Sequence, residues 1–140
     1  MSYITQAELQ DFIPEAELIQ LTDDAALGAV DTGKIDAAIA AAGSIIDSYA
    51  GAVYALPLQA SVRVKELARD LTIWHLEKRR RQIREDTQTA YDAAMAFLKD
   101  LARGNAVLDQ PSGEPAQTAT DEVKVTEIEP VFTDDNLDAF

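Results

Sequence analysis

Apolar residues recur at helical intervals along most of the chain, and the clearest repeat lies in its first half. Its members are spaced three or four residues apart: Ile35, Ile39, Ala42, Ile46, Tyr49 and Val53. That spacing places them on one stripe of an α-helix, because a helix returns to the same face about every 3.6 residues. The pattern therefore predicts a long helix over residues 33–53 that buries this stripe.

A proline and a glycine indicate where the longer helices end. Pro57 cannot continue the first long helix, since it lacks a backbone N–H and its ring crowds the preceding turn. A second long helix is predicted over residues 59–84, with Val64, Leu67, Leu71 and Trp74 on its apolar stripe. A third is predicted over residues 87–103, with Tyr91, Ala94, Met95, Leu98 and Leu101 on its stripe and Gly104 as its stop. A short apolar elbow around Pro57 therefore joins the two long helices.

Two short helices are predicted ahead of the long ones. Thr5 can cap a helix over residues 6–12, and Glu8 stands where it completes a capping box. Pro14 then starts a second short helix that runs to Leu21. Together these elements predict an all-α fold, a small helical bundle with two long helices and shorter ones.

The chain divides into a helical part and an acidic part. A polar connection over residues 22–33 leads into the first long helix, which Asp31 or Thr32 can cap. We expect one helical domain over residues 1–108 and an extended, flexible, acidic C-terminal arm over residues 109–140.

The arm differs from the rest of the chain in both charge and pattern. Residues 105–140 hold nine acidic residues and one basic residue, and Pro111, Gly113 and Pro115 break any helix there. The arm nevertheless contains apolar residues at intervals, among them Val125, Ile128, Val131, Phe132 and Phe140. A solvated tail needs no such residues, whereas an arm that folds onto a partner does. We therefore favour docking of these five residues on a neighbouring subunit or another protein over a simple solvated tail.

Overall composition excludes several classes of protein. The net charge of -13 argues against a chain that wraps nucleic acid as a whole, since it would repel phosphates. There is no Cys, so no disulfide or thiolate site is possible, which suits a reducing compartment. No apolar run approaches the roughly 20 residues of a membrane helix. We expect a soluble protein that is not exported and has no membrane partner.

A basic run stands out against the acidic background. Five cations crowd the predicted end of the second long helix: Lys78, Arg79, Arg80, Arg81 and Arg84. They could contact a DNA backbone, pair with acids on a protein surface, or complement the helix dipole as a solvated helix end. Because the same chain carries an acidic arm, we favour contacts between subunits.

No arrangement of residues in the sequence indicates catalysis or metal binding. His75 is the only histidine and has no recognisable nucleophile or acid to work with, so we interpret it as structural. Asp23, Asp24 and Asp31 lack the ligand spacing and closing Glu of a calcium loop, so we interpret them as turn and cap residues. We predict no enzymatic activity, no cofactor and no metal.

Several short motifs resemble a known family. They are Ile-Asp-Ser-Tyr at residues 46–49, Tyr-Ala-Leu-Pro-Leu at 54–58, and Leu-Ala-Arg-Asp-Leu at 67–71, with the segments at 3–9 and 17–23. In combination they resemble the small head-tail connector, or adaptor, proteins of Mu-like tailed bacteriophages. The resemblance covers about residues 1–108, and none of its motifs is catalytic.

The resemblance implies a structural role in the virion. Members of such a family bind beneath the portal at the neck as a ring, here expected to have twelve copies, through which DNA passes non-specifically. The implied partners are other copies of the chain, the portal protein and a stopper or tail-completion protein, with assembly in the bacterial host cytoplasm. The five cations would then serve subunit or lumen contacts. The alternative is a small DNA-binding or regulatory helical protein, which would use the basic helix end as its contact.

Overall fold

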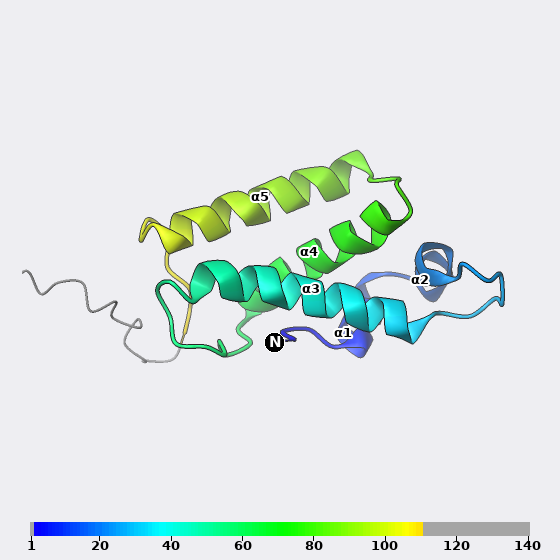
Figure 1. Cartoon of the computed structure of the whole chain (residues 1–140), viewed down its shortest axis with the longest axis horizontal. Coiled ribbons are helices and arrows are strands. Elements are labelled where there is room, and N and C mark those ends of the chain that lie inside the picture. The colour runs from blue at the N-terminus through cyan, green and yellow to red at the C-terminus, as the bar shows by residue number, and fades with distance from the viewer. Residues whose placement is uncertain (1, 111–140) are drawn as a thin grey trace, which may run out of the picture.

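A computed structural model describes residues 2–110, and five helices run through this part of the chain (Figure 1). They are α1 (Gln6–Phe12), α2 (Glu15–Thr22), α3 (Thr32–Ala50), α4 (Val62–Arg79) and α5 (Glu85–Ala102). Within residues 2–110 there is no strand, so the prediction of a small all-α bundle is confirmed.

The three longer helices form the body of the bundle. α3 packs along α4, and α5 packs against both (Figure 1). The short helices α1 and α2 contact α3 and α4 on the side away from α5. None of the helices within residues 2–110 is long and apolar enough to cross a membrane.

The core consists of the predicted apolar stripes. Fully buried members include Ile35, Ala42, Ile46, Val64, Leu71, Leu98 and Leu101. At the end of the first stripe, Tyr49 and Val53 are only half-buried, because α3 stops at Ala50 and Val53 lies in the turn beyond it. Burial of the stripes is the main stabilising contribution to such a fold, at roughly 25 cal/mol per Å² of apolar surface.

Helix starts follow the predicted caps. The Thr5 hydroxyl accepts from the Glu8 N–H at 3.2 Å and the Glu8 carboxylate accepts from the Thr5 N–H at 2.9 Å, a complete capping box. Asp31 caps α3 by accepting from the Lys34 N–H. Of the two predicted caps for this helix, the structure uses Asp31.

The second long helix is shorter than its predicted range of 59–84, and that prediction was wrong at both ends. Ser61 caps α4 at its start, and Arg81 adopts a left-handed conformation with φ +59° after its end. The Arg81 N–H donates to the Lys78 carbonyl at 2.9 Å, and the Gln82 N–H to the Glu77 carbonyl at 3.3 Å. This hydrogen-bond pair is a Schellman stop. The basic run therefore spans the end of α4 and the α4–α5 turn.

The end of the described chain packs against the elbow between α3 and α4. The elbow contains a cis Leu56–Pro57 peptide and the buried Leu58. Leu108 is also buried, and its N–H donates to the Tyr54 hydroxyl at 2.9 Å. Gln110 exchanges two hydrogen bonds with the backbone of Gln59. The five residues predicted to dock the arm, Val125, Ile128, Val131, Phe132 and Phe140, lie outside the described residues.

Candidate interaction surface

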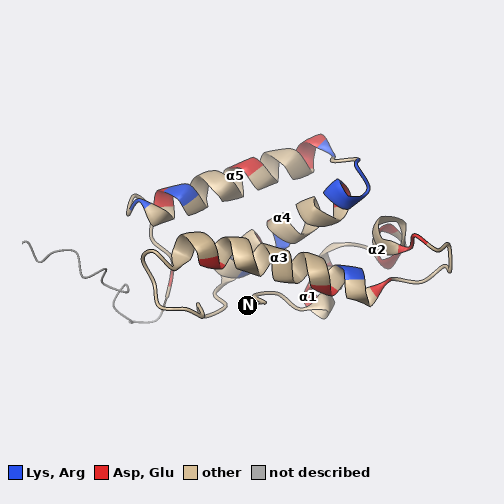
Figure 2. Cartoon of the chain, viewed as in Figure 1, with Lys and Arg blue, Asp and Glu red and all other residues tan. Residues whose placement is uncertain are grey.

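The five cations of the basic run lie at one end of the bundle. They occupy the last turn of α4 and the α4–α5 turn, at the same end as α2 and the α2–α3 loop (Figure 2). Their side chains divide into two groups. Three are held by other parts of the chain, and two are directed to solvent.

Arg79 and Arg80 both bind Asp24 in the α2–α3 loop. Arg79 does so with two parallel hydrogen bonds, Nη1 to Oδ2 at 2.6 Å and Nη2 to Oδ1 at 2.9 Å. Arg80 adds Nη1 to Oδ1 at 3.1 Å, and the Lys34 Nζ lies 2.7 Å from Oδ2. One carboxylate therefore joins the end of α4 to the loop and to the start of α3.

The same three cations also cover the C-terminus of α2. Arg80 donates from Nε to the Gln20 carbonyl at 2.9 Å, and Arg79 from Nη2 to the Leu21 carbonyl at 2.6 Å. Lys34 donates to the Thr22 carbonyl at 3.1 Å. Carbonyl groups in the last turn of a helix have no partner within the helix and carry its negative dipole end. The cations of the basic run therefore complement the C-terminus of α2 as well as the C-terminus of α4, on which they lie.

Asp24 is strongly stabilised in its charged form. Hydrogen bonds from Arg79, and after it from Lys34, hold the pKa of the Asp24 carboxyl well below its usual value. A carboxylate with a lowered pKa stabilises the folded state above its unfolded pKa and loses that contribution only as pH falls toward the folded one. The link between α4 and the loop therefore persists through neutral and mildly acidic pH.

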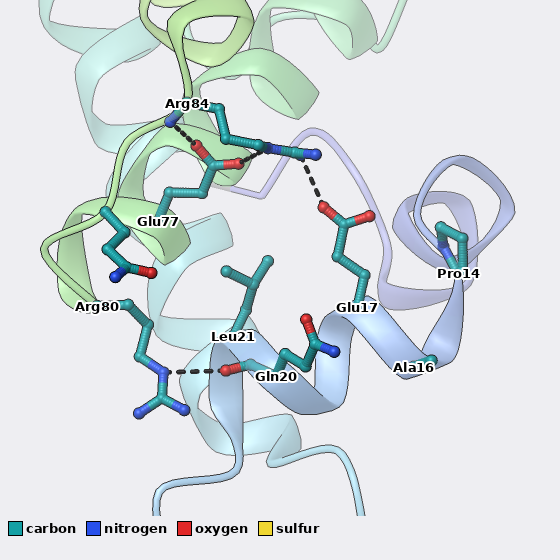
Figure 3. A pocket seen from close by; sticks show the side chains of 9 residues that line it. Pro14, Ala16, Glu17, Gln20, Leu21, Glu77, Arg80 and Arg84 are labelled. Carbon is teal, nitrogen blue, oxygen red and sulfur yellow. Dashed lines mark hydrogen bonds and ion pairs between the residues drawn. The ribbon is translucent and has the colours of Figure 1, made fainter.

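Arg84 connects two acids across the α4–α5 turn (Figure 3). Its Nε donates to the Glu77 carboxylate at 2.8 Å, and its Nη2 lies 2.7 Å from Glu17 on α2. Glu77 is only 2% exposed and also accepts from the Arg84 backbone N–H at 3.0 Å. Because Arg84 is the N-cap residue of α5, this buried carboxylate holds the start of the helix.

An open groove of about 820 Å³ lies between α2 and the α4–α5 turn. Its apolar lining comes from Pro14, Ala16 and Leu21, and its polar lining from Glu17, Gln20, Glu77, Arg80, Gln82 and Arg84. Figure 3 shows Leu21 directed into the groove, with Arg80 and Arg84 on different sides of it. The groove therefore combines an apolar surface with two arginines, Arg80 and Arg84, and with the two acids, Glu17 and Glu77, that Arg84 binds.

The remaining two cations of the run are directed to solvent. Lys78 is exposed, with its Nζ 4.8 Å from the centre of the Trp74 ring. The side chain of Arg81 is exposed and forms no hydrogen bond or ion pair with the described residues. These two side chains have no acidic partner among the described residues and can bind a phosphate or an acid on another molecule, whereas Arg79, Arg80 and Arg84 already bind within the chain.

Trp74 and His75 have packing roles. The Trp74 ring stacks on Tyr91 of α5, with centroids 4.0 Å apart, and its Nε1 donates to Gln88 at 3.1 Å. His75 is half-buried and meets Trp74 edge-on, and burial, followed by the charge of Lys78, lowers its pKa. His75 is therefore neutral at pH 7, as expected for a structural histidine.

Of the three acids compared with a calcium loop, Asp23 and Asp31 serve as turn and cap residues, whereas the prediction was wrong for Asp24, which binds Arg79, Arg80 and Lys34. The Asp23 carboxylate accepts from the N–H groups of Leu27 and Gly28 at 2.9 and 2.8 Å, and Asp31 caps α3. Within the described residues, His and acidic side chains form no group of three or more that could hold a metal ion.

The pairing partners of the basic run are what sequence reasoning missed. Glu77 did carry a signal, because it lies three residues after Trp74 and so continues the apolar stripe of α4. A charged residue on a buried stripe needs a partner, and the five cations that follow Glu77 within seven positions were the candidates for it. Asp24 and Glu17 gave no comparable signal, since only the packing of α2 against α4 brings them close.

Comparison with known proteins identifies the family. A phage protein family described as bacteriophage Mu Gp36 matches residues 3–127, which include all five helices and every residue that lines the groove. No curated protein gives a significant match to the chain. The match covers well over half of the 140 residues. The chain therefore belongs to the bacteriophage Mu Gp36 family and is a Mu-like phage protein.

Proposed function

We propose that this protein is a head-tail connector, or adaptor, of a Mu-like phage. In this proposal it forms a ring, with twelve copies, below the portal at the virion neck and provides the passage for DNA and the attachment point for the tail. Its partners are other copies of itself, the portal protein and a stopper or tail-completion protein. It catalyses no reaction and needs no cofactor.

The observation that carries the proposal is the family match over residues 3–127. A structural or morphogenetic role in a Mu-like phage fits a chain whose conspicuous side chains bind one another. At the α2–α4 end, Asp24, Glu17 and Glu77 are held in ion pairs with Arg79, Arg80 and Arg84. These ion pairs fix the end of α4 and the start of α5 against α2 and the loop after it, which gives a rigid surface for assembly.

Lys78 and Arg81 are the residues we assign to subunit or lumen contacts first. Both are exposed, and DNA attracts such cations regardless of its base sequence. The other three cations, Arg79, Arg80 and Arg84, contribute indirectly in this proposal, because their ion pairs hold the contact surface in place.

Analysis of purified particles tests the assignment. We expect quantitative mass spectrometry of isolated necks to find this protein in a ratio near one to the portal protein, and antibody labelling to mark the neck. Deletion of its gene should yield filled heads and free tails that do not join. Absence from the neck, or a single copy per particle, would overturn the proposal.

A DNA-binding regulator is the second candidate, and the exposure of Lys78 and Arg81 favours it. Titration of a labelled duplex against wild type and K78E/R81E separates the two functions. Weak binding that falls steeply with salt and shows no base preference fits a DNA passage. Tight, sequence-selective binding by a protein that is absent from particles would favour the regulator.

A further inference from the structure

We propose that the groove between α2 and the α4–α5 turn binds the acidic arm of a second copy of this chain, with residues 123–127 lying across it. The inference rests on the proposed function, since a ring requires one contact to repeat from copy to copy. The inference names the groove as the surface of that contact and the arm of the next copy as its partner.

The groove offers two guanidinium groups with donors to spare. Arg80 uses Nε and Nη1 for Gln20 and Asp24, and Arg84 uses Nε and Nη2 for Glu77 and Glu17. Neither Nη2 of Arg80 nor Nη1 of Arg84 bonds to a described residue. Because the other nitrogens hold each side chain in place, the free donors can bind a carboxylate at little further cost in entropy.

The arm carries the complementary chemistry. Residues 111–140 contain eight acids and one base. Within them Val123, Val125 and Glu127 alternate with other residues, so an extended chain would present all three on one face. That face matches the groove, with a valine for the apolar surface around Leu21 and a carboxylate for an arginine. The volume of about 820 Å³ lies in the range of roughly 300 to 1,000 Å³ typical of binding sites.

The positions of the start of the arm and of the groove at opposite ends of the bundle allow a contact that repeats from copy to copy. Gln110 is held against the elbow by its hydrogen bonds with Gln59, and the elements that line the groove, α2 and the α4–α5 turn, lie at the other end of the bundle (Figure 1). The 18 residues of α5 separate the two ends by about 27 Å at the usual helical rise. An arm that leaves one end and binds at the opposite end of the next copy makes a head-to-tail contact, which can close into a ring.

Cysteine cross-linking tests the contact directly, because the natural chain has no Cys. Full-length Q82C, which alters the groove, is mixed with full-length V125C, which alters the arm, and the mixture is oxidised. We expect a disulfide-linked pair of unlike chains on a non-reducing gel. A93C replaces Q82C in the control, since Ala93 is exposed on α5 away from the groove. The control mixture should form at least about tenfold less of the unlike pair.

The outcomes separate this inference from the proposed function. Rings seen by electron microscopy without a Q82C–V125C cross-link would overturn the arm contact and leave the connector function intact. A cross-link without rings or neck incorporation would support the arm contact and count against the connector. A Q82C/V125C double variant that cross-links only within one chain would overturn the assignment to a second copy.

Charge reversal in the arm provides an independent test. E127K should weaken self-association of the full chain by about tenfold, because it places a cation against Arg80 and Arg84. E114K makes the same change of charge in the same arm outside the proposed segment, and should leave self-association close to wild type. Equal effects of E127K and E114K would show that only the net charge of the arm matters and would overturn the assignment of residues 123–127.

Discussion

At the scale of single residues, Tyr3 connects three parts of the chain through one hydroxyl group. The hydroxyl donates to the Asp47 carboxylate on α3 and accepts from the Leu58 N–H in the elbow at 3.2 Å. The ring is 4% exposed. Burial, followed by the hydrogen bond to Asp47, raises the pKa of Tyr3 to about 12. Tyr3 therefore joins the N-terminal segment to α3 and to the elbow.

Tyr3→Phe should lower the free energy of unfolding at pH 7 by about 1 to 3 kcal/mol, because the buried Leu58 N–H loses its acceptor. The penalty should shrink between about pH 10 and 12. There the unfolded phenol loses its proton while the folded one keeps it, so wild type loses stability as pH rises, by about 1.4 kcal/mol per unit. Urea unfolding across this range measures both effects. Tyr91→Phe is the matched control, and a penalty independent of pH would contradict the prediction.

At the scale of elements, the α4–α5 turn depends on two features that helical periodicity does not reveal. One is the left-handed Arg81, which ends α4. The other is the Glu77–Arg84 pair, which holds the start of α5 to the end of α4. Arg81 and Arg84 both belong to the basic run, so this run determines the structure of the turn in addition to any contact with partners.

Arg81→Gly should raise the free energy of unfolding by up to about 1 kcal/mol. The left-handed conformation strains every residue with a Cβ, and glycine adopts it freely. Arg81→Ala removes the same charge and keeps the strain, so it should show no gain. Thermal unfolding of the two variants beside wild type decides the matter. Equal stability of the Gly and Ala variants would mean that backbone strain at this position is negligible.

Arg84→Gln should lower the free energy of unfolding by about 1 to 3 kcal/mol, because it leaves the buried Glu77 charge without its cation. Arg103→Gln removes an exposed arginine at the end of α5 and should change stability by less than about 0.5 kcal/mol. Chemical denaturation of both variants compares them. Hydrogen exchange should show earlier opening of α5 in Arg84→Gln, and equal protection in both variants would argue that Glu77 does not hold this helix.

At the scale of the whole molecule, the described fold extends beyond the last helix. Leu108 is 3% exposed and packs in the core, although the composition of the chain already changes after Asn105. The segment that follows α5 returns to the elbow and binds Tyr54 and Gln59. The expected division between residues 1–108 and 109–140 stays a prediction, and the hydrogen bonds of Gln110 suggest that a truncated protein should retain it.

Two truncations test this view of the boundary. A chain that ends at Gln110 should melt like the full chain, because it keeps every contact of the described fold. A chain that ends at Asn105 should lose about 2 to 4 kcal/mol, since it removes the buried Leu108 side chain and its hydrogen bond to Tyr54. Calorimetry and circular dichroism measure both. Equal stability of the two truncations would show that the return segment contributes nothing to the fold.

The sequence by itself determined the helices and most of their caps. Thr5, Glu8 and Asp31 act where the pattern predicted, and Ile35, Ile46 and Leu98 are buried as their spacing indicated. These features depend on residues within a few positions of one another, and local backbone geometry decides them.

Only the tertiary structure decided the end of α4, the partners of the basic run and the existence of the groove. Arg79 and Asp24 are separated by 55 positions, and no local pattern relates them. Arg84 and Glu17 meet only because α2 packs against α4. An ion pair or a groove forms from the relative placement of whole helices, which the packing of the entire core sets. A spacing of three or four residues specifies which face of a helix is buried, but it carries no information about which distant segment covers that face.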